Sequence, residues 1–469
     1  MTAPPPLART IGEFAATVDP PERVRVDVPP RILDVLGNAL AAYAEPGADA
    51  APAAIRAMRR WGGAGESTVL GYGDRLPAPS AAFVNGVLAH SLDYDDTHLP
   101  SVLHPSASVV PAALAAAEAG APGDLIAAIA AGIEVTNRLG MAGCDPDTGA
   151  NLYFERGQHA TSICGTIGAA VAVARLYELD AGRIADAVGI AASMGAGVLE
   201  ANRTGGSVKR AHCGWAAHGG VVAATLAAEG LTGPPTVLEG RFGFFTAHTG
   251  RFDAGAVTDA LGERWELLRT VFKPYPSNHF THAGIDCALA LRAAGLDPDD
   301  VTGIELGVAE PVLRTIAEPA AEKARPRTGY HAKFSGPYTV AVALTGGTGL
   351  GVGLDDFAGL DPRRLELAAK VRVVADPAAT AAFPRAFAGV LRVRTRSGHL
   401  LEHRVDSSRG GPGHPLRADE VTAKFAGNAT RALDAGAVGA LAAAAWALDA
   451  GGPVSALFPF RETVFRDAK

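Results

Sequence analysis

The stretch from residue 90 to residue 104 gathers many side chains that could do chemistry. It reads His-Ser-Leu-Asp-Tyr-Asp-Asp-Thr-His from His90 to His98, and a further histidine stands at His104, just before a proline. Alanine-rich segments flank it on both sides, and we expect them to be buried helices. Ionisable groups in an apolar setting are disfavoured unless they pair, bind metal or shift their pKa, so they concentrate at functional sites. The stretch therefore predicts a functional site.

Two interpretations of this stretch stay open. Asp95, Asp96 and His98 fit a solvated turn, in which an aspartate caps the next helix, as well as they fit catalysis. Asp93 and His104 favour chemistry. Asp93 would lie on the face of the preceding helix if that helix continues, and the proline after His104 suits the first turn of the next helix.

A second candidate segment, 155–162, places His159 at the start of an apolar helix. Backbone amides and the positive end of the helix dipole favour an anion there. A histidine at that position is equally consistent with a cap or a core residue.

A third segment, 204–214, is a glycine-flanked loop that delivers Lys209 and Arg210 just before another apolar helix. Cations on such a loop suit a carboxylate or phosphate ligand. The spacing of a Walker loop is absent, so nucleotide binding is weakly supported.

The fourth segment, 272–282, holds Lys273 between a strand end and two prolines. Only seven of the 42 basic residues are lysines, so a lysine among glycine, alanine and aromatic residues indicates a need for a compact ammonium with a tunable pKa. The alternative is a rigid turn with an exposed lysine.

Other common chemistries lack their motifs in this sequence. A Gly-x-Ser-x-Gly elbow is absent, so a Ser-His-Asp hydrolase is not indicated. The Asp-x-Asp-Asp pattern that starts at Asp93 could suggest magnesium, but no phosphate-binding partner motif accompanies it, and we predict no metal site.

Composition limits the class of protein. The 469 residues predict at least two domains, and 48% hydrophobic with 19% charged residues indicates a globular chain. The net charge of −7 makes nucleic acid and anionic membranes improbable partners. Four widely spaced cysteines fit neither a zinc site nor a disulfide scaffold, and no signal peptide is visible. We expect a cytoplasmic location.

The order of expected elements predicts the domain organisation. Alanine- and glycine-rich helices fill the chain up to about residue 266, strands and helices alternate from 267 to 405, and helices return at 417–433 and 436–449. The fold class is therefore mainly α: one all-helical domain from residues 1–266 and 406–469, and a smaller α+β domain from residues 267–405.

Taken together, these segments resemble the MmgE/PrpD family, which includes 2-methylcitrate dehydratase, cis-aconitate decarboxylase and iminodisuccinate epimerase. The motifs that carry the resemblance are residues 83–98, His-Pro-Ser at 104–106, Gly-Gly-Ser-Val-Lys-Arg-Ala-His-Cys-Gly at 205–214, Lys-Pro-Tyr-Pro at 273–276 and Lys-Phe-Ser at 333–335. The resemblance implies a helical domain built from both chain ends, a smaller α+β lid domain, an active site between them that needs no cofactor, and a homodimer. By motif matching, the active-site positions fall on Asp93, Thr97, His104, His159, Lys209 and Lys273.

The sequence departs from the family at one position. Decarboxylases of the family carry a histidine five residues after the lid lysine, where this chain has Asn278 followed by His279. We include His279 among the substrate-binding candidates, and the departure argues against a specific assignment as a cis-aconitate decarboxylase.

These residues predict a lyase. His104, Asp93 and Lys209 are the expected catalytic groups, with the Asp93 carboxylate orienting the His104 ring, or with Lys209 as the base. Thr97, His159, Lys273 and His279 are the expected substrate-binding groups. The predicted reaction removes a proton next to a carboxylate or carbonyl of a small polycarboxylic acid and expels water. An epimerase, a decarboxylase and a non-catalytic polycarboxylate-binding protein are the alternatives.

Overall fold

The computed structural model describes residues 4–45, 50–201, 206–411 and 413–458. The chain forms two compact units. The helical unit comprises Met1–Ser91, Asp95–Thr270 and Val421–Lys469, and the α+β unit comprises Leu92–Tyr94 and Val271–Glu420. The α+β unit thus includes three residues of the acidic stretch, which the sequence assigns to the helical domain. The predicted fold class, mainly α with a smaller α+β part, is confirmed.

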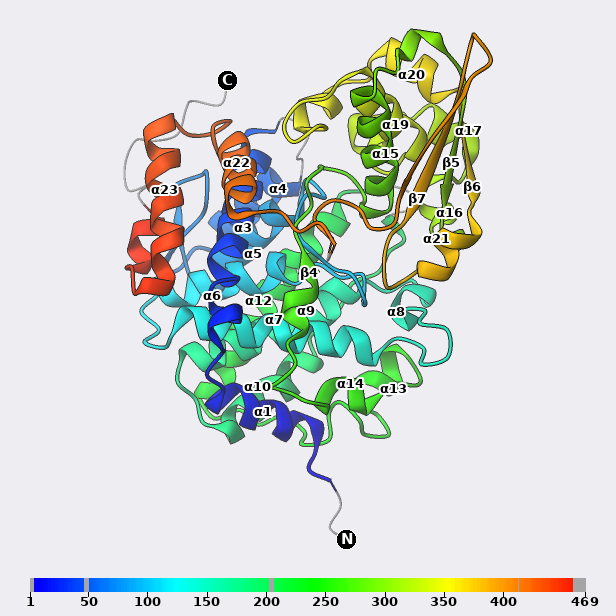
Figure 1. Ribbon diagram of the computed structural model, residues 1–469. Coiled ribbons are helices and arrows are strands. Elements are labelled where there is room, and N and C mark those ends of the chain that lie inside the picture. Colours follow the sequence, from blue (N-terminus) through cyan, green and yellow to red (C-terminus); the bar gives the residue numbers. More distant parts are fainter. Residues whose placement is uncertain (1–3, 46–49, 202–205, 412, 459–469) are drawn as a thin grey trace. The chain divides into compact units, whose positions relative to one another are not determined.

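The helical unit consists of alanine- and glycine-rich helices that pack against one another (Figure 1). Its helices are α1 (Leu7–Thr17), α2 (Glu22–Arg25), α3 (Val28–Ala44), α4 (Ala50–Trp61), α5 (Ala78–His90), α6 (Ser106–Glu118), α7 (Leu125–Ala142), α8 (Leu152–Glu155), α9 (Ala160–Leu176), α10 (Ala181–Ala192), α12 (Val208–Ala228), α13 (Phe244–His248), α14 (Ala254–Thr258), α22 (Ala418–Ala429) and α23 (Ala435–Ala447). Its short strands are β1 (Ser67–Thr68), β2 (Arg75–Leu76) and β3 (Thr97–His98), and β4 (Thr270–Val271) ends the segment.

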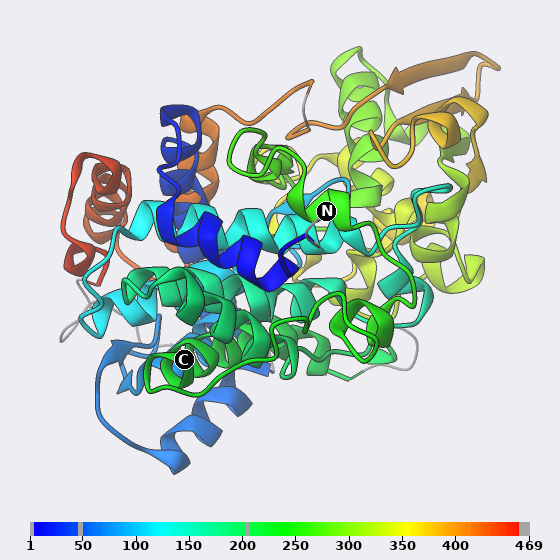
Figure 2. The ribbon, with the colours of Figure 1, turned by 90° about the horizontal axis from the view of Figure 1, so that it is seen from below.

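Both ends of the chain build the helical unit. Helix α3, blue, lies beside α22, orange, in both ribbon views (Figures 1 and 2). A buried ion pair joins them, with Lys424 Nζ 2.6 Å from Asp34 Oδ1. The Asn428 side chain also donates to Asn38 over 3.0 Å, although 390 positions separate the two residues. The C-terminal segment is therefore fixed to the N-terminal helices by buried polar contacts.

Two glycines let α5 and α12 approach closely. A Cβ added at Gly86 would lie 2.8 Å from the Cα of Gly214, and one added at Gly214 would lie 2.3 Å from the carbonyl oxygen of Phe83. Any larger residue would push the two backbones apart. The close crossing brings the end of α5, with His90, next to the beginning of α12.

The α+β unit is built on a four-stranded sheet of order β6-β5-β7-β8. Strand β5 pairs in parallel with β6 and antiparallel with β7, and β7 forms a hairpin with β8. The strands are β5 (Val301–Val308), β6 (Val371–Ala375), β7 (Gly389–Thr395) and β8 (Leu400–Val405), and the helices are α15 (His282–Ala293), α16 (Leu313–Ile316), α17 (Ala320–Ala324), α18 (Gly329–Ala332), α19 (Gly336–Thr345), α20 (Pro362–Ala368) and α21 (Pro377–Ala382).

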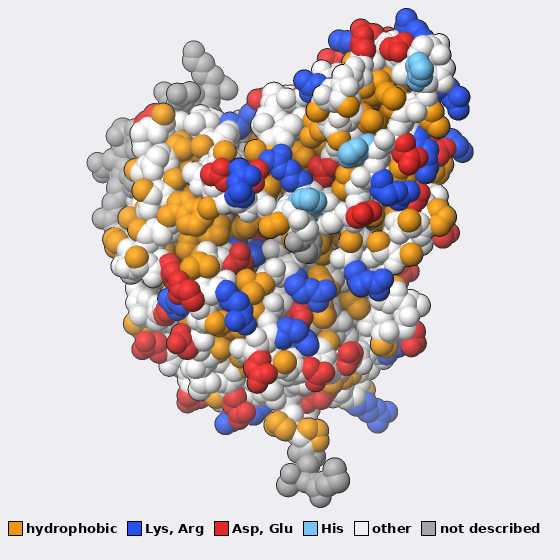
Figure 3. Space-filling view, in the orientation of Figure 1, with side chains coloured by type: hydrophobic (Ala, Val, Ile, Leu, Met, Phe, Trp, Pro, Cys, Tyr) orange, Lys and Arg blue, Asp and Glu red, His pale blue; other side chains and the backbone are white. Residues whose placement is uncertain are grey.

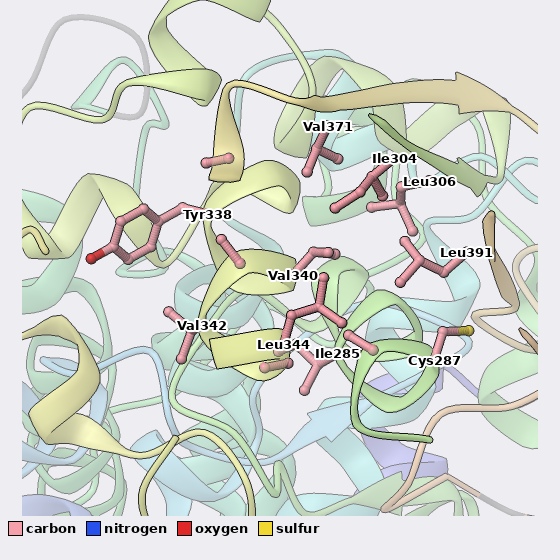
Figure 4. Close-up of a cluster of buried hydrophobic side chains, with 14 of the residues drawn as sticks. Ile285, Cys287, Ile304, Leu306, Tyr338, Val340, Val342, Leu344, Val371 and Leu391 are labelled. Atoms are coloured by element: carbon pink, nitrogen blue, oxygen red, sulfur yellow. The ribbon is translucent and has the colours of Figure 1, made fainter. Parts of the chain in front are cut away.

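Helices α15 and α19 form the core of this unit with the sheet. Ile304, Leu306 and Leu391 extend from the strands toward helix side chains that include Ile285 and Val340 (Figure 4). All five are buried. Apolar side chains on alternate strand positions therefore meet the apolar faces of two helices, as expected for a half-buried sheet.

The charge distribution on the surface and the longest apolar helix bear on contact with nucleic acid and with membranes. On the face shown in Figure 3, positively and negatively charged side chains are interspersed with hydrophobic ones. Among the described residues, only α7 is long and apolar enough to cross a membrane, and 94% of that helix is buried inside the protein. Burial of this degree is typical of a core helix.

The ion pair between α22 and α3 makes a testable contribution to stability. Replacing Lys424 with methionine leaves the Asp34 carboxylate buried without its cation, so we expect the free energy of unfolding to fall by about 3–5 kcal/mol. Urea unfolding followed by tryptophan fluorescence reports on the right unit, because all four tryptophans belong to it: Trp61, Trp215, Trp265 and Trp446.

An exposed pair serves as the control for this experiment. Arg9 and Glu13 lie 2.8 Å apart with both side chains about half exposed, so Arg9→Ala should change the free energy of unfolding by less than about 1 kcal/mol. Adding Asp34→Asn to Lys424→Met should recover part of the loss. Equal losses in Lys424→Met and Arg9→Ala would contradict the assignment.

Candidate active site

Four imidazoles of the helical unit lie together and are called here the histidine cluster: His90, His104, His159 and His212. The ring centroid of His90 lies 5.4 Å from that of His104 and 5.6 Å from that of His159. The centroids of His159 and His212 are 5.1 Å apart. His104 is half-buried, and the other three are buried. Residues from four separate helical segments therefore converge on one place.

The position of the proton on His104 follows from its hydrogen bond. Its Nδ1 lies 2.6 Å from the backbone oxygen of Asp96, with Thr97 Oγ1 at 3.4 Å. A carbonyl oxygen can only accept, so Nδ1 must carry the proton and donate it. In the neutral ring, Nε2 therefore holds the lone pair and is the basic atom. The backbone of Asp96, rather than a carboxylate, orients this histidine at Nδ1.

Asp96 is itself held in place by a buried ion pair. Arg31 Nη1 donates to its Oδ2 over 3.0 Å, and both side chains are 1% exposed. The hydroxyl and the backbone N–H of Ser106, at the start of α6, donate to the same carboxylate over 2.5 and 3.3 Å. Burial raises the pKa of Asp96 to about 6, against the opposing effect of Arg31. The N-cap residue of α6 is Pro105, so the expectation of a solvated turn with an aspartate as the cap does not hold for Asp96, which is a buried carboxylate that fixes the start of α6.

His90 and Asp95 form a separate buried pair. His90 Nδ1 lies 2.7 Å from Asp95 Oδ2, and the two side chains are 1% and 0% exposed. The Nε2 of His90 is buried and has no hydrogen-bond partner among the described residues. Neither residue is among the catalytic groups predicted from the sequence.

His159 and His212 share one hydrogen bond between their Nδ1 atoms, which are 3.0 Å apart. One ring must donate and the other accept, so at least one of them is neutral. Burial, then the charge of Lys209, lowers the pKa of His159 well below its usual value. Burial and the neighbouring His90 and Lys209 lower the pKa of His212 to about 4. Both rings are therefore neutral at neutral pH.

Lys209 lies on a helix rather than on a loop. Helix α12 begins at Val208, so Lys209 stands in its first turn, and His212 follows one turn later. The first residues of the predicted glycine-flanked loop, 204 and 205, lie outside the described residues. Lys209 thus precedes His212 by three residues on one helix, and its positive charge lowers the pKa of both His159 and His212.

Asp93 and Lys273 form a pair within the α+β unit. Lys273 Nζ donates to the backbone oxygen of Asp93 over 2.8 Å and lies 3.3 Å from its Oδ2. Helix α5 ends at His90, and Asp93 adopts a left-handed backbone conformation with φ of 55°. The expectation that Asp93 continues the face of that helix is therefore wrong. Aspartate tolerates this conformation better than most residues, and the lysine fixes both its carbonyl and its carboxylate.

His279 and Asn278 occupy a rigid turn of the same unit. Asn278 Oδ1 accepts from the backbone N–H of Phe280 over 3.1 Å, which caps a short 3-10 helix, η2 (His279–Thr281). The His279 ring is buried, 4.5 Å from the ring of His282 and 5.3 Å from that of Phe387. The structure thus gives Asn278 a capping role, and the part of His279 in substrate binding stays a prediction.

His98 is held by neighbours of the helical unit. Its Nδ1 lies 2.7 Å from Ser101 Oγ, and its Nε2 lies 3.5 Å from a carboxylate oxygen of Glu266. Burial lowers the pKa of His98 to about 4, even though Glu266 acts in the opposite direction. A structural role accounts for these contacts.

One group of buried side chains could in principle hold a metal ion. Potential ligand atoms of His90, Asp95 and Cys213 lie within 4.8 Å of one another. Burial and the neighbouring Asp95 carboxylate raise the pKa of the Cys213 thiol well above its usual value, which disfavours the thiolate that metals need. A hydrogen-bonded His90–Asp95 pair fits these residues better than a metal centre does.

The structure thus places the sequence-predicted residues in two sets. In the helical unit, His104 and His159 belong to the histidine cluster. Thr97 Oγ1 lies 3.4 Å from His104 Nδ1, and Lys209 precedes His212 on α12. In the α+β unit, Asp93 and Lys273 are paired, and His279 lies in the turn that follows. The sequence did not single out His212, which could have been found from its place three residues after Lys209 once both were assigned to one helix.

The neutral state of buried His98 predicts acid sensitivity. Its pKa is lower in the folded chain than the unfolded value of about 6.5, so the folded state binds fewer protons between pH 6.5 and 4, and stability falls as the pH drops through this window. Between pH 7 and pH 5, His98→Gln should lose about 2 kcal/mol less unfolding free energy than the natural protein. Urea unfolding at the two pH values measures this, and equal losses would contradict the role of His98.

The chain is similar to several known proteins. The chain is 31% identical to the human cis-aconitate decarboxylase over 387 residues, which cover 78% of this chain and 76% of the relative. It is 30% identical to a cis-aconitate decarboxylase-like protein, oryM, of Aspergillus oryzae, over 62% of this chain and 63% of that protein. It is also 30% identical to the cis-aconitate decarboxylase of Aspergillus terreus, over 49% of this chain and 48% of that enzyme.

The domain matches cover most of the chain. Residues 7–257 match the MmgE/PrpD N-terminal domain, and residues 275–450 match the MmgE/PrpD C-terminal domain. Both matches follow the order that the sequence motifs predict. The protein belongs to the MmgE/PrpD family.

Proposed function

We propose that the protein is a lyase, independent of any cofactor, that moves a proton on a carbon next to a carboxylate of a small polycarboxylic acid. The observation that carries the proposal is the hydrogen bond from His104 Nδ1 to the backbone oxygen of Asp96, 2.6 Å long. It leaves Nε2 of a half-buried imidazole as the basic atom. Histidine anchored in this way is suited to general acid–base catalysis near neutral pH.

Charge near His104 supports the binding of an anionic substrate. Lys209 supplies an ammonium group in the first turn of α12, where the helix dipole also favours negative charge. The neutral rings of His159 and His212 can donate hydrogen bonds without adding positive charge. Preorganised donors of this kind stabilise the negative charge that develops when a proton leaves a carbon beside a carboxylate.

Dehydration is the first candidate reaction. His104 Nε2 would take the proton from the carbon next to the carboxylate, and the electron pair of the C–H bond would form the new double bond. The β-hydroxyl would then take that proton from His104 and leave as water with the electron pair of the C–O bond. Asn278 supports this choice over decarboxylation, because the histidine of the family's decarboxylases is replaced there by a capping asparagine.

Decarboxylation is the second candidate, and the relatives favour it. The human protein and the A. terreus protein are named cis-aconitate decarboxylases. In that reaction the electron pair of the breaking C–C bond stays on the substrate, carbon dioxide leaves, and a carbon of the substrate takes up a proton. The same imidazole, in its protonated form, would supply that proton.

One assay separates these reactions and their alternatives. The purified protein is incubated in deuterium oxide with methylcitrate, citrate, cis-aconitate or iminodisuccinate, and the products are followed by NMR. Loss of water with a new alkene supports dehydration, and release of carbon dioxide supports decarboxylation. Deuterium exchange without an alkene would indicate epimerisation. Binding without exchange or turnover would indicate a binding protein and would refute the proposal.

Replacing His104 tests the acid–base role. His104→Ala should lower kcat by about 10²–10⁴-fold while the fold is preserved, because the imidazole that takes up the proton is removed. His218 is the matched control: it lies on α12 and bonds through Nδ1 to the backbone oxygen of Pro79 over 3.0 Å. His218→Ala should leave kcat within a few-fold. Near-normal turnover in His104→Ala would refute the role.

Replacing Lys273 tests the predicted substrate-binding cation of the α+β unit. Lys273→Met should lower kcat/KM by about 100-fold, because a buried ammonium that can interact with a substrate carboxylate is lost. Lys273→Arg should show the same loss of kcat/KM. A planar guanidinium does not fit where a compact ammonium contacts the backbone oxygen and Oδ2 of Asp93.

Lys323 is the control lysine in the same unit. It donates to the backbone oxygens of Thr315 and Phe334 over 2.6 and 2.9 Å. Lys323→Met removes a lysine that also donates to backbone oxygen. At temperatures where this variant is folded, its kcat/KM should stay within a few-fold of that of the natural protein. A full kcat/KM in Lys273→Met would exclude Lys273 from the reaction.

A further inference from the structure

We propose that Asp95 and His90 act as a positioning pair beside His104, in which the His90 ring holds the Asp95 carboxylate and this carboxylate supplies, through space, the negative charge that balances the proton carried by His104 during the reaction. This inference rests on the proposed function and extends it to two residues outside the predicted catalytic set. It makes Asp95 a functional carboxylate, whereas its neighbour Asp96 has a structural role.

The geometry of the pair carries the argument. The 2.7 Å contact between His90 Nδ1 and Asp95 Oδ2 requires a proton between the two atoms, so Nδ1 donates and the neutral ring has its lone pair on Nε2. That Nε2 is buried and has no hydrogen-bond partner among the described residues. The centroid of the His90 ring lies 5.4 Å from that of His104 and 5.6 Å from that of His159.

His90 and His104 differ in the group that anchors them. Both have Nδ1 bonded to an oxygen, but the partner of His104 is a neutral carbonyl and the partner of His90 is a carboxylate. A carboxylate stabilises an adjacent imidazolium far better than a carbonyl does. When His104 gains a proton, Asp95 is therefore the group that can offset the new charge through space, and His90 keeps its carboxylate in place.

The other charges near the pair are already paired or have the opposite sign. Asp96 is held by Arg31, and Asp34 is held by Lys424. The titratable and charged groups that face the pair are Asp34 on α3, Asp96 and His104 in the adjoining segment, His159 on α9, and Lys209, His212 and Cys213 on α12. Lys209 is cationic, and the imidazoles of His159 and His212 are neutral, so the compensating charge falls to Asp95.

The proton step balances without any additional reactant. The proton moves from the substrate carbon to Nε2 of His104, and the electron pair of the C–H bond stays with the substrate. Asp95 and His90 exchange no atoms with the substrate in this step. They act through His104, and the consequence is a higher affinity of His104 for its proton.

The test measures the titration of His104 directly. The intact protein is labelled with ¹⁵N-histidine, and the His104 signal is assigned by its loss in His104→Ala. Asp95→Asn should lower the midpoint of the His104 titration by about half a pH unit or more, because a negative charge near the ring is lost. His90→Asn keeps an N–H donor for Asp95 and keeps the carboxylate, so it should not lower the midpoint.

Steady-state kinetics give a second reading. Asp95→Asn should reduce kcat about tenfold or more with little change in KM, and it should move the acidic limb of the kcat/KM profile to lower pH. His98→Gln is the matched control, since His98 lies in the same segment but bonds to Ser101. It should leave the His104 midpoint and the acidic limb in place.

The outcomes separate this inference from the proposed function. A His104 midpoint that stays unchanged in Asp95→Asn, or that falls equally in His90→Asn or His98→Gln, would overturn the inference. If the natural protein turns over no polycarboxylate, the proposed function fails, and the NMR titration still decides whether Asp95 is coupled to His104.

Discussion

The buried ion pair between Arg31 and Asp96 is the interaction on which the histidine cluster depends. Arg31, on α3, also donates to the backbone oxygens of Leu267 and Thr270, so one guanidinium joins three segments of the helical unit. A buried pair of this kind requires that every donor and acceptor be satisfied, which here fixes the Asp96 backbone. Because the carbonyl of Asp96 orients His104, the ion pair determines which nitrogen of that histidine is basic.

The three aspartates of the acidic stretch have different roles because they are buried among different neighbours. The carboxylate of Asp96 is bonded to a guanidinium and a hydroxyl, whereas that of Asp95 is bonded to an imidazole. Asp93, two residues earlier, belongs to the α+β unit, where Lys273 binds it. Three aspartates within four positions thus serve the anchoring of α6, charge balance and the pairing of a lysine, and their surroundings decide which of these each performs.

Local sequence patterns predicted the helices and strands well, but they could not predict contacts between residues that are far apart in the chain. Helical periodicity predicted the alanine-rich helices on both sides of the α+β segment. Lys209 was expected on a loop just before its helix, because the glycine and serine that precede it weaken the helical signal. The site residues followed from family motifs, whereas the Arg31–Asp96 pair joins positions 65 residues apart and leaves no local signal. The turn at Asp93 was missed for a related reason: a left-handed aspartate depends on a lysine 180 positions away.

The contacts of five lysines explain why lysine is scarce in this chain. Lys273, Lys323, Lys333 and Lys370 each donate to a backbone oxygen, and Lys424 pairs with a buried carboxylate. A compact ammonium can reach a carbonyl where a planar guanidinium would need more room, so this arginine-rich chain keeps lysine for such positions. Lys209 stands half-buried in the first turn of α12, and its positive charge lowers the pKa of two neighbouring histidines. A cation at the start of a helix favours a negatively charged group, which agrees with the anionic substrate that we propose.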